Sequence, residues 1–159
     1  EDESFLEIYE QSMRDIFEFF KPDVVITQNG ADAHYFDPLT HLYGTMNIYQ
    51  YIPKLARELA NEYCGGKWIG VGGGGYDIWR VVPRAWSYVW LAMNDIPYPT
   101  GNISDEWLEK YQQEAPVQLV PTWDDPANLY EPIPRTAEIQ EKNAQMMKKA
   151  LHIIHKNQV

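Results

Sequence analysis

Two apolar runs, each followed closely by glycine, constrain the fold of this chain most strongly. Residues 23–27 have the β-branched character of a buried strand, and the chain then turns at Gly30 and reaches Asp32. The second run, residues 68–71, leads into four consecutive glycines and then Tyr76. Polar groups directly after buried strands are typical of ligand sites in open α/β sheets. The two strand ends therefore predict one functional site.

Helical periodicity predicts a helix before the first strand and another between the two strands. Apolar residues recur at helical spacing over residues 4–20 and again over residues 45–62. A strand, a helix and a second strand in this order form a right-handed unit with parallel strands. We therefore predict an α/β fold with a parallel sheet and helices on both faces, and we expect Asp32 and Tyr76 to emerge at the same edge of that sheet.

The chain beyond the second strand divides into a helix, a proline-rich stretch and a last helix. Aromatic and aliphatic residues predict a helix over residues 77–93, and the proline-rich stretch that follows contains one short predicted helix, residues 104–113. A final helix is predicted over residues 136–156. We expect a core over residues 4–93 and, over residues 94–159, a surface excursion with the terminal helix, all within one domain.

Charge and cysteine content exclude several classes of function. The formal charge of −10 repels nucleic-acid phosphates and anionic membrane surfaces. No apolar run reaches the roughly 18 residues of a membrane span. The single cysteine, Cys64, permits no disulfide within the chain and fits a reducing compartment. We therefore expect a cytoplasmic protein without nucleic-acid or membrane partners. The first residue is not Met, which is compatible with the removal of an upstream segment.

A carboxylate and a phenol at neighbouring strand ends suggest a metal held by one and a developing oxyanion met by the other. Asp32 is the candidate ligand, although on spacing alone it is also a common turn residue. His34 and His41 lie in the same loop, and the spacing Asp32-Ala-His34 could chelate a metal. A histidine on an irregular loop is, however, more often solvated or hydrogen-bonded. Tyr76 is the candidate hydrogen-bond donor.

The glycine run also satisfies the dinucleotide-binding pattern G-x-G-x-x-G over residues 70–75. Such a site needs a helix directly behind the third glycine and an acidic residue at the end of a following strand. This chain has Tyr76 and then Pro83 at that place, and Asp95 falls at the end of a predicted helix. Nucleotide binding is therefore not favoured.

Four segments around the two strand ends form a pattern known from one enzyme family. They are Lys21-Pro-Asp-Val-Val-Ile-Thr-Gln-Asn-Gly-Ala-Asp32, Asp37-Pro-Leu39, Gly72-Gly-Gly-Gly-Tyr76 and Arg84-Ala-Trp86. In this order they resemble the C-terminal half of the zinc-dependent histone deacetylase family, which has the arginase/deacetylase fold. The resemblance implies that residues 1–159 form the C-terminal portion of a single deacetylase domain, with a sheet that is incomplete because the N-terminal half is absent.

The resemblance also implies a reaction, which is the hydrolysis of acetyl-lysine amides in a protein or of a small acetylated amine. Asp32 matches a zinc ligand of the family, and Tyr76 matches the catalytic tyrosine that hydrogen-bonds the substrate carbonyl and then the oxyanion. Leu39 matches a wall of the acyl-lysine channel, and Gly74 and Gly75 match its floor. The implied cofactor is Zn²⁺, which would activate water and polarise the amide.

The family's other zinc ligands and its His-His general base have no counterpart in this sequence. We therefore expect the chain to need the missing N-terminal half for activity, and its isolated sheet to expose an unpaired edge and apolar faces. Two alternatives remain. One is a non-catalytic module that binds a partner through its aromatic tail. The other is a ureohydrolase of the same fold with two manganese ions, although that chemistry favours a further aspartate in the strand-end motif.

Overall fold

The computed structural model describes residues 2–131 and 134–156, in which helices follow and separate two parallel strands. In chain order the elements are α1 (Asp2–Phe20), β1 (Val25–Asn29), α2 (Met46–Cys64), β2 (Trp68–Gly72), α3 (Val82–Met93), α4 (Asp105–Gln112) and α5 (Thr136–Lys156). The strands pair from Val25 opposite Trp68 to Asn29 opposite Gly72. The parallel α/β architecture predicted from the sequence is confirmed.

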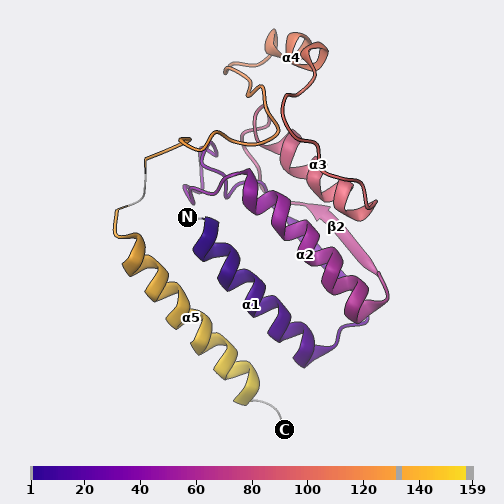
Figure 1. Ribbon diagram of the computed structural model, residues 1–159, viewed down its shortest axis with the longest axis vertical. Coiled ribbons are helices and arrows are strands. Elements are labelled where there is room, and N and C mark those ends of the chain that lie inside the picture. The colour runs from indigo at the N-terminus through magenta and orange to yellow at the C-terminus, as the bar shows by residue number, and fades with distance from the viewer. Residues whose placement is uncertain (1, 132–133, 157–159) are drawn as a thin grey trace.

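Helices α2 and α3 contact the sheet, α1 packs on α2, and α5 packs on α1. Figure 1 shows α5, α1 and α2 side by side, and α2 contacts both strands. Helix α3 contacts α2 and β2. One cluster of buried side chains, including Phe17 and Val25, joins α1, β1 and α2. A second cluster, including Met46 and Tyr88, joins α2, α3 and the loop after β1 through Ala31. This second cluster anchors the loop that carries Asp32.

The two faces of the sheet differ in burial. Val25 is 8% exposed, whereas its neighbour Ile26 is 68% exposed. On β2, Ile69 and Val71 are about half exposed as well. Because successive strand residues point to opposite faces, the helices cover one face and the other presents apolar side chains to solvent. The sequence predicts helices on both faces, whereas in the described residues they cover only one, and the bare face fits a sheet that is incomplete.

Two element boundaries differ from the sequence prediction. Strand β1 begins and ends two residues later than the predicted range 23–27, because Val25 N–H pairs with Lys67 O at 2.9 Å and the polar end of the strand still pairs with β2. Helix α3 begins at Val82 rather than at residue 77, because Asp77 first closes a turn by accepting the Arg80 N–H at 2.7 Å.

The other helices agree closely with the sequence. Helix α2 begins after Thr45, whose side chain accepts the Asn47 N–H, and it ends at Gly65 in the left-handed conformation. Ser104 caps α4 in the same way, through the Trp107 N–H. Helix α5 has the predicted bounds. Among the described residues, no helix is long and apolar enough to cross a membrane.

Candidate functional site

The loops after β1 and β2 lie directly against each other. The Ala31 N–H donates to Gly74 O at 2.6 Å, and the Trp86 indole N–H from α3 donates to Asn29 O at 2.9 Å. A Cβ placed on Gly74 would overlap Asp32 Oδ2, far inside van der Waals contact. Only glycine at position 74 therefore allows the Asp32 carboxylate to occupy its place.

Asp37 connects the Asp32 loop to Tyr76. This carboxylate is buried, at 2% exposure, and its Oδ1 accepts the N–H groups of Leu39 and Thr40 at 2.9 and 3.3 Å. Its Oδ2 accepts the Tyr76 N–H at 2.9 Å. One side chain thus fixes the backbone of Leu39 and of Tyr76, although the two are far apart in sequence.

The side chains of Tyr76 and Leu39 point outward. They are 53% and 60% exposed, and within the described residues no hydrogen bond is made by the Tyr76 phenol. Gly75 backs onto the start of α3, where a Cβ would lie 2.7 Å from Val82 Cγ2. The structure therefore brings Asp32 into contact with Gly74 and ties Leu39 and Tyr76 to the same pair of loops.

The Asp32 carboxylate remains available to a ligand. In the part of the chain that the structure describes, its side-chain oxygens accept no hydrogen bond, while its backbone oxygen accepts from Thr40 Oγ1. The Tyr49 phenol lies against the Asp32 loop. Burial raises the pKa of Tyr49, and the negative charges of Asp32 and Asp37 raise this pKa further. The protonated Tyr49 phenol donates to Ala31 O at 2.8 Å and supports the loop from beneath.

His34 and His41 do not join Asp32 in a metal site. The described residues contain no group of three or more His, Cys, Asp or Glu side chains that could hold a metal ion. His34 is fully buried, and both of its ring nitrogens are already used. His41 is exposed, at a left-handed backbone position with φ of 53°. Asp32 thus fits a metal as one ligand, and the other ligands would have to come from outside these residues.

Asp37 and Asp125 are the residues that sequence reasoning missed. The Asp37-Pro38 pair indicates a turn, which the Leu39 and Thr40 bonds confirm, but no local pattern indicates the bond to Tyr76. Asp125 lies in the proline-rich stretch and bonds His34 across 91 positions of sequence. Contacts of this separation leave no periodicity or spacing that could reveal them.

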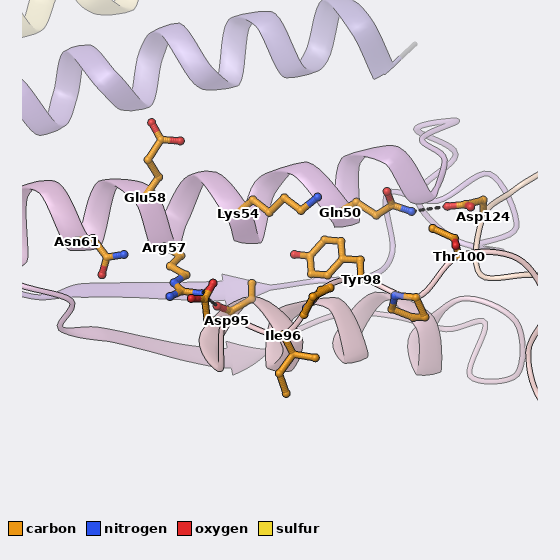
Figure 2. A pocket seen from close by; sticks show the side chains of 13 residues that line it. Gln50, Lys54, Arg57, Glu58, Asn61, Asp95, Ile96, Tyr98, Thr100 and Asp124 are labelled. Carbon is orange, nitrogen blue, oxygen red and sulfur yellow. Dashed lines mark hydrogen bonds and ion pairs between the residues drawn. The ribbon is translucent and has the colours of Figure 1, made fainter.

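A large cavity lies away from the strand ends. Its volume is about 750 Å³, and it opens between α2 and residues 95–100 (Figure 2). Its cationic groups are largely engaged, since Arg57 Nη1 bonds Asp95 Oδ1 at 2.5 Å and Lys54 Nζ lies 4.3 Å from the centre of the Tyr98 ring. Neither Asp32 nor Tyr76 lines this cavity, so it is separate from the strand-end site.

Comparison with known proteins places this geometry in a family. The family model described as the histone deacetylase domain matches residues 1–93. The acetoin utilization protein AcuC of Bacillus subtilis (strain 168) is 60% identical over 158 residues, which is 99% of this chain and 41% of that protein. AcuC of Staphylococcus xylosus is 44% identical over 95% of the chain, and AcuC of Staphylococcus aureus (strain N315) is 46% identical over 96%.

The chain spans about two fifths of the length of these curated relatives, since it covers 41% of the first and 39% of the other two. The matched family model nevertheless includes both loops of the strand-end site, with Asp32, Asp37, Gly74 and Tyr76, and it extends over more than half of the chain. The chain therefore belongs to the histone deacetylase domain family.

Proposed function

We propose that this chain supplies the C-terminal part of the active site of a zinc-dependent lysine deacetylase. The observation that carries the proposal is the strand-end geometry, in which the Asp32 carboxylate lies against Gly74 and accepts no hydrogen bond from the described residues, while Tyr76, two positions after Gly74, exposes its phenol. An oxygen ligand with an unshared lone pair and a nearby hydrogen-bond donor are the two groups that metal-assisted amide hydrolysis needs. The relatives named for acetoin utilization suggest that the enzyme serves that process.

Each predicted site residue has a role in this proposal. Asp32 would be one zinc ligand, and zinc, when bound, would activate a water molecule and polarise the amide carbonyl. Tyr76 would donate a hydrogen bond to the substrate oxygen as negative charge develops on it. Leu39, Gly74 and Gly75 would line the channel for the acyl-lysine side chain. The products would be acetate and the free lysine amine.

The remaining parts of the site would come from outside this chain. A single carboxylate does not hold a catalytic zinc ion, because such sites use three protein ligands and leave one position open. The absent ligands and the general base would lie on the N-terminal half of the enzyme. That half would also cover the bare face of the sheet, where Ile26, Ile69 and Val71 are exposed. The composition and the lone Cys64 suggest that the enzyme works in the cytoplasm.

Zinc binding by a completed protein tests the proposal. We define the completed protein as this chain joined to the N-terminal part of the Bacillus subtilis relative. It should bind about one zinc ion and hydrolyse an acetyl-lysine peptide, whereas its Asp32→Asn variant should lose most of the zinc because an amide is a poor zinc ligand. Zinc content by atomic absorption and acetate release are the measurements.

The alternative is a non-catalytic module that binds a partner, and the exposed apolar face gives it some support. A completed protein that folds but neither binds zinc nor releases acetate would contradict the deacetylase proposal and favour this alternative. Asp23→Asn serves as the control for Asp32→Asn, because Asp23 is exposed and precedes β1, at the opposite end of the strand from the two loops.

A further inference from the structure

A buried cluster of charged and polar side chains lies behind the strand-end site. It consists of His34, Arg84 and Asp125, whose side chains are 0%, 3% and 3% exposed. Asp125 Oδ2 accepts from His34 Nε2 at 2.8 Å and from the Met46 N–H at 2.7 Å. Asp125 Oδ1 accepts from Arg84 Nη1 at 2.9 Å. Both oxygens of one buried carboxylate are therefore occupied by three donors from three parts of the chain.

The hydrogen bonds of His34 fix its tautomer. Its Nδ1 accepts the Phe36 N–H at 3.1 Å, so this nitrogen carries no proton and Nε2 is the donor to Asp125. One ring nitrogen of His34 is thus bonded to its own loop, and the other is bonded to Asp125. Because His34 lies two positions after Asp32, this contact fixes the loop that presents the candidate metal ligand.

Arg84 holds the other side of Asp125. Its Nε donates at 2.7 Å to Arg80 O, in the turn before α3, and its Nη1 also donates to Trp123 O at 3.2 Å. The charge of Asp125 is therefore balanced by one guanidinium, and the segment that carries Asp125 is tied to α3. A buried ion pair with this many hydrogen bonds has one arrangement of low energy, which makes it suited to positioning.

Asp125 connects the stretch beyond the family match to the elements around the strand-end site. The family model matches residues 1–93, so Asp125 lies in the stretch beyond it. The same residue contacts the Asp32 loop through His34, the start of α2 through Met46 and α3 through Arg84. Those three elements are the ones that frame the strand-end site.

We propose that Asp125 is a positioning residue of the strand-end site, through which the proline-rich stretch holds the Asp32 loop in the geometry that binds metal. The proposal rests on the proposed function. In this role Asp125 would act through His34 and would touch neither metal nor substrate. An asparagine at position 125 would present its NH₂ group either to Arg84 or to His34 and Met46, so the cluster would lose at least one bond that no rotation restores.

Asp125→Asn in the completed protein tests this role, with Asp124→Asn as the matched control. Asp124 is the adjacent carboxylate, but it points toward the large cavity and accepts from Gln50 Nε2 at 2.6 Å (Figure 2). Zinc affinity is measured by competition with a chromophoric chelator, and loop order by hydrogen exchange of the Phe36 and Met46 amides. Both are recorded at a temperature where each variant is fully folded.

The expected result is a drop in zinc affinity of about tenfold for Asp125→Asn, together with faster exchange at both amides, and no change in either for Asp124→Asn. A folded Asp125→Asn protein with the zinc affinity and exchange rates of the control overturns the proposal. If the asparagine variant does not fold, Asp125→Glu keeps the charge and moves the oxygens by one methylene. The glutamate variant should still lose zinc affinity, and wild-type affinity in it overturns the proposal.

The same measurements separate this inference from the proposed function. If the wild-type completed protein binds no zinc, the deacetylase proposal fails, and amide exchange alone then decides whether Asp125 holds the loop. If the wild-type protein binds zinc and turns over while Asp125→Asn behaves as the control, the positioning role fails and the deacetylase proposal stands.

Discussion

Asp37 and Asp125 show how single buried carboxylates set the geometry of this site. Asp37 accepts the N–H groups of Leu39 and Tyr76, and Asp125 accepts from His34 and Arg84. A carboxylate accepts hydrogen bonds through both of its oxygens, so it can hold donors on two sides at once, whereas a neutral amide has only one acceptor oxygen. The exposed Tyr76 therefore depends on a residue that solvent hardly reaches.

Asp37→Asn should destabilise the completed protein by about 1–3 kcal/mol, because asparagine cannot accept from both Tyr76 and Leu39 and leaves a buried donor unpaired. Urea unfolding at pH 7 measures the change. Asp23→Asn, on an exposed residue, should change the free energy of unfolding by less than about 0.5 kcal/mol. Equal effects of the two substitutions would contradict the role given to Asp37.

The stability of the protein should depend on the ionisation of Asp125. Burial alone would raise the pKa of Asp125, but the His34 hydrogen bond, the Arg84 charge and the Met46 N–H together hold it below its ordinary value. A carboxylate with a lowered pKa stabilises the folded state fully above its unfolded pKa of about 4 and loses that contribution as the pH falls through the folded pKa.

The difference in unfolding free energy between wild type and Asp125→Asn should therefore be constant from pH 7 to about 5 and should shrink below about pH 4. Urea unfolding at pH 7, 5, 4 and 3 measures it. A difference that stays the same at every pH would show that the charge of Asp125 is not what the network uses.

At the scale of elements, the sequence predicted the strands and helices well and their exact ends less well. Strand β1 was predicted two residues too early. Gln28 and Asn29 are polar residues typical of loops, and only their pairing with β2 identifies them as strand residues. Helix α3 was predicted five residues too early, because Asp77 resembles a helical residue but closes a turn. Local pattern decides which element forms, and tertiary pairing decides where it ends.

The candidate site likewise contains residues that the sequence predicts and residues that it does not. Asp32, Gly74 and Tyr76 follow strands and could be found from the chain alone, because parallel strands bring their ends together. Asp125 could not be found, since its partner His34 is 91 positions away and the stretch around it has no periodic pattern.

Gly74→Ala should weaken zinc binding by the completed protein at least about tenfold, because its Cβ would overlap Asp32 Oδ2 and force the carboxylate to move. Zinc competition and urea unfolding are the measurements. Gly65→Ala is the control, since φ is 59° there and no atom lies within 4 Å of the added Cβ. It should cost about 1 kcal/mol of stability and leave zinc affinity unchanged. Loss of zinc affinity in both variants would point to unfolding instead.

At the scale of the whole molecule, the described chain has apolar surface without a partner. Its sheet has two strands, and one face exposes Ile26, Ile69 and Val71. On α3, Trp90 is also more than half exposed. A two-stranded sheet is marginal by itself, and an open edge next to an apolar face favours association with other chains.

The chain alone should therefore self-associate and bind the dye ANS, and the completed protein should do neither. Light scattering coupled to size-exclusion chromatography and ANS fluorescence measure the two effects. Ile69→Lys should reduce the association of the isolated chain, because it places a charge on the bare face, whereas Ile153→Lys on the exposed side of α5 should not. A monomeric isolated chain without ANS binding would show that the exposed apolar face of the sheet does not drive association.

The hydrolysis rate of the completed protein with Tyr76→Phe tests the central claim most directly. Loss of a hydrogen-bond donor at a developing oxyanion lowers kcat by about 10²–10³, so the variant should keep its zinc and lose activity by that factor. Tyr43→Phe removes the phenol of another exposed tyrosine, 40% exposed against 53% for Tyr76, from the loop before α2 and should keep full activity. If Tyr76→Phe hydrolyses acetyl-lysine as fast as Tyr43→Phe does, Tyr76 does not stabilise the transition state and the strand-end site is not the catalytic site described above.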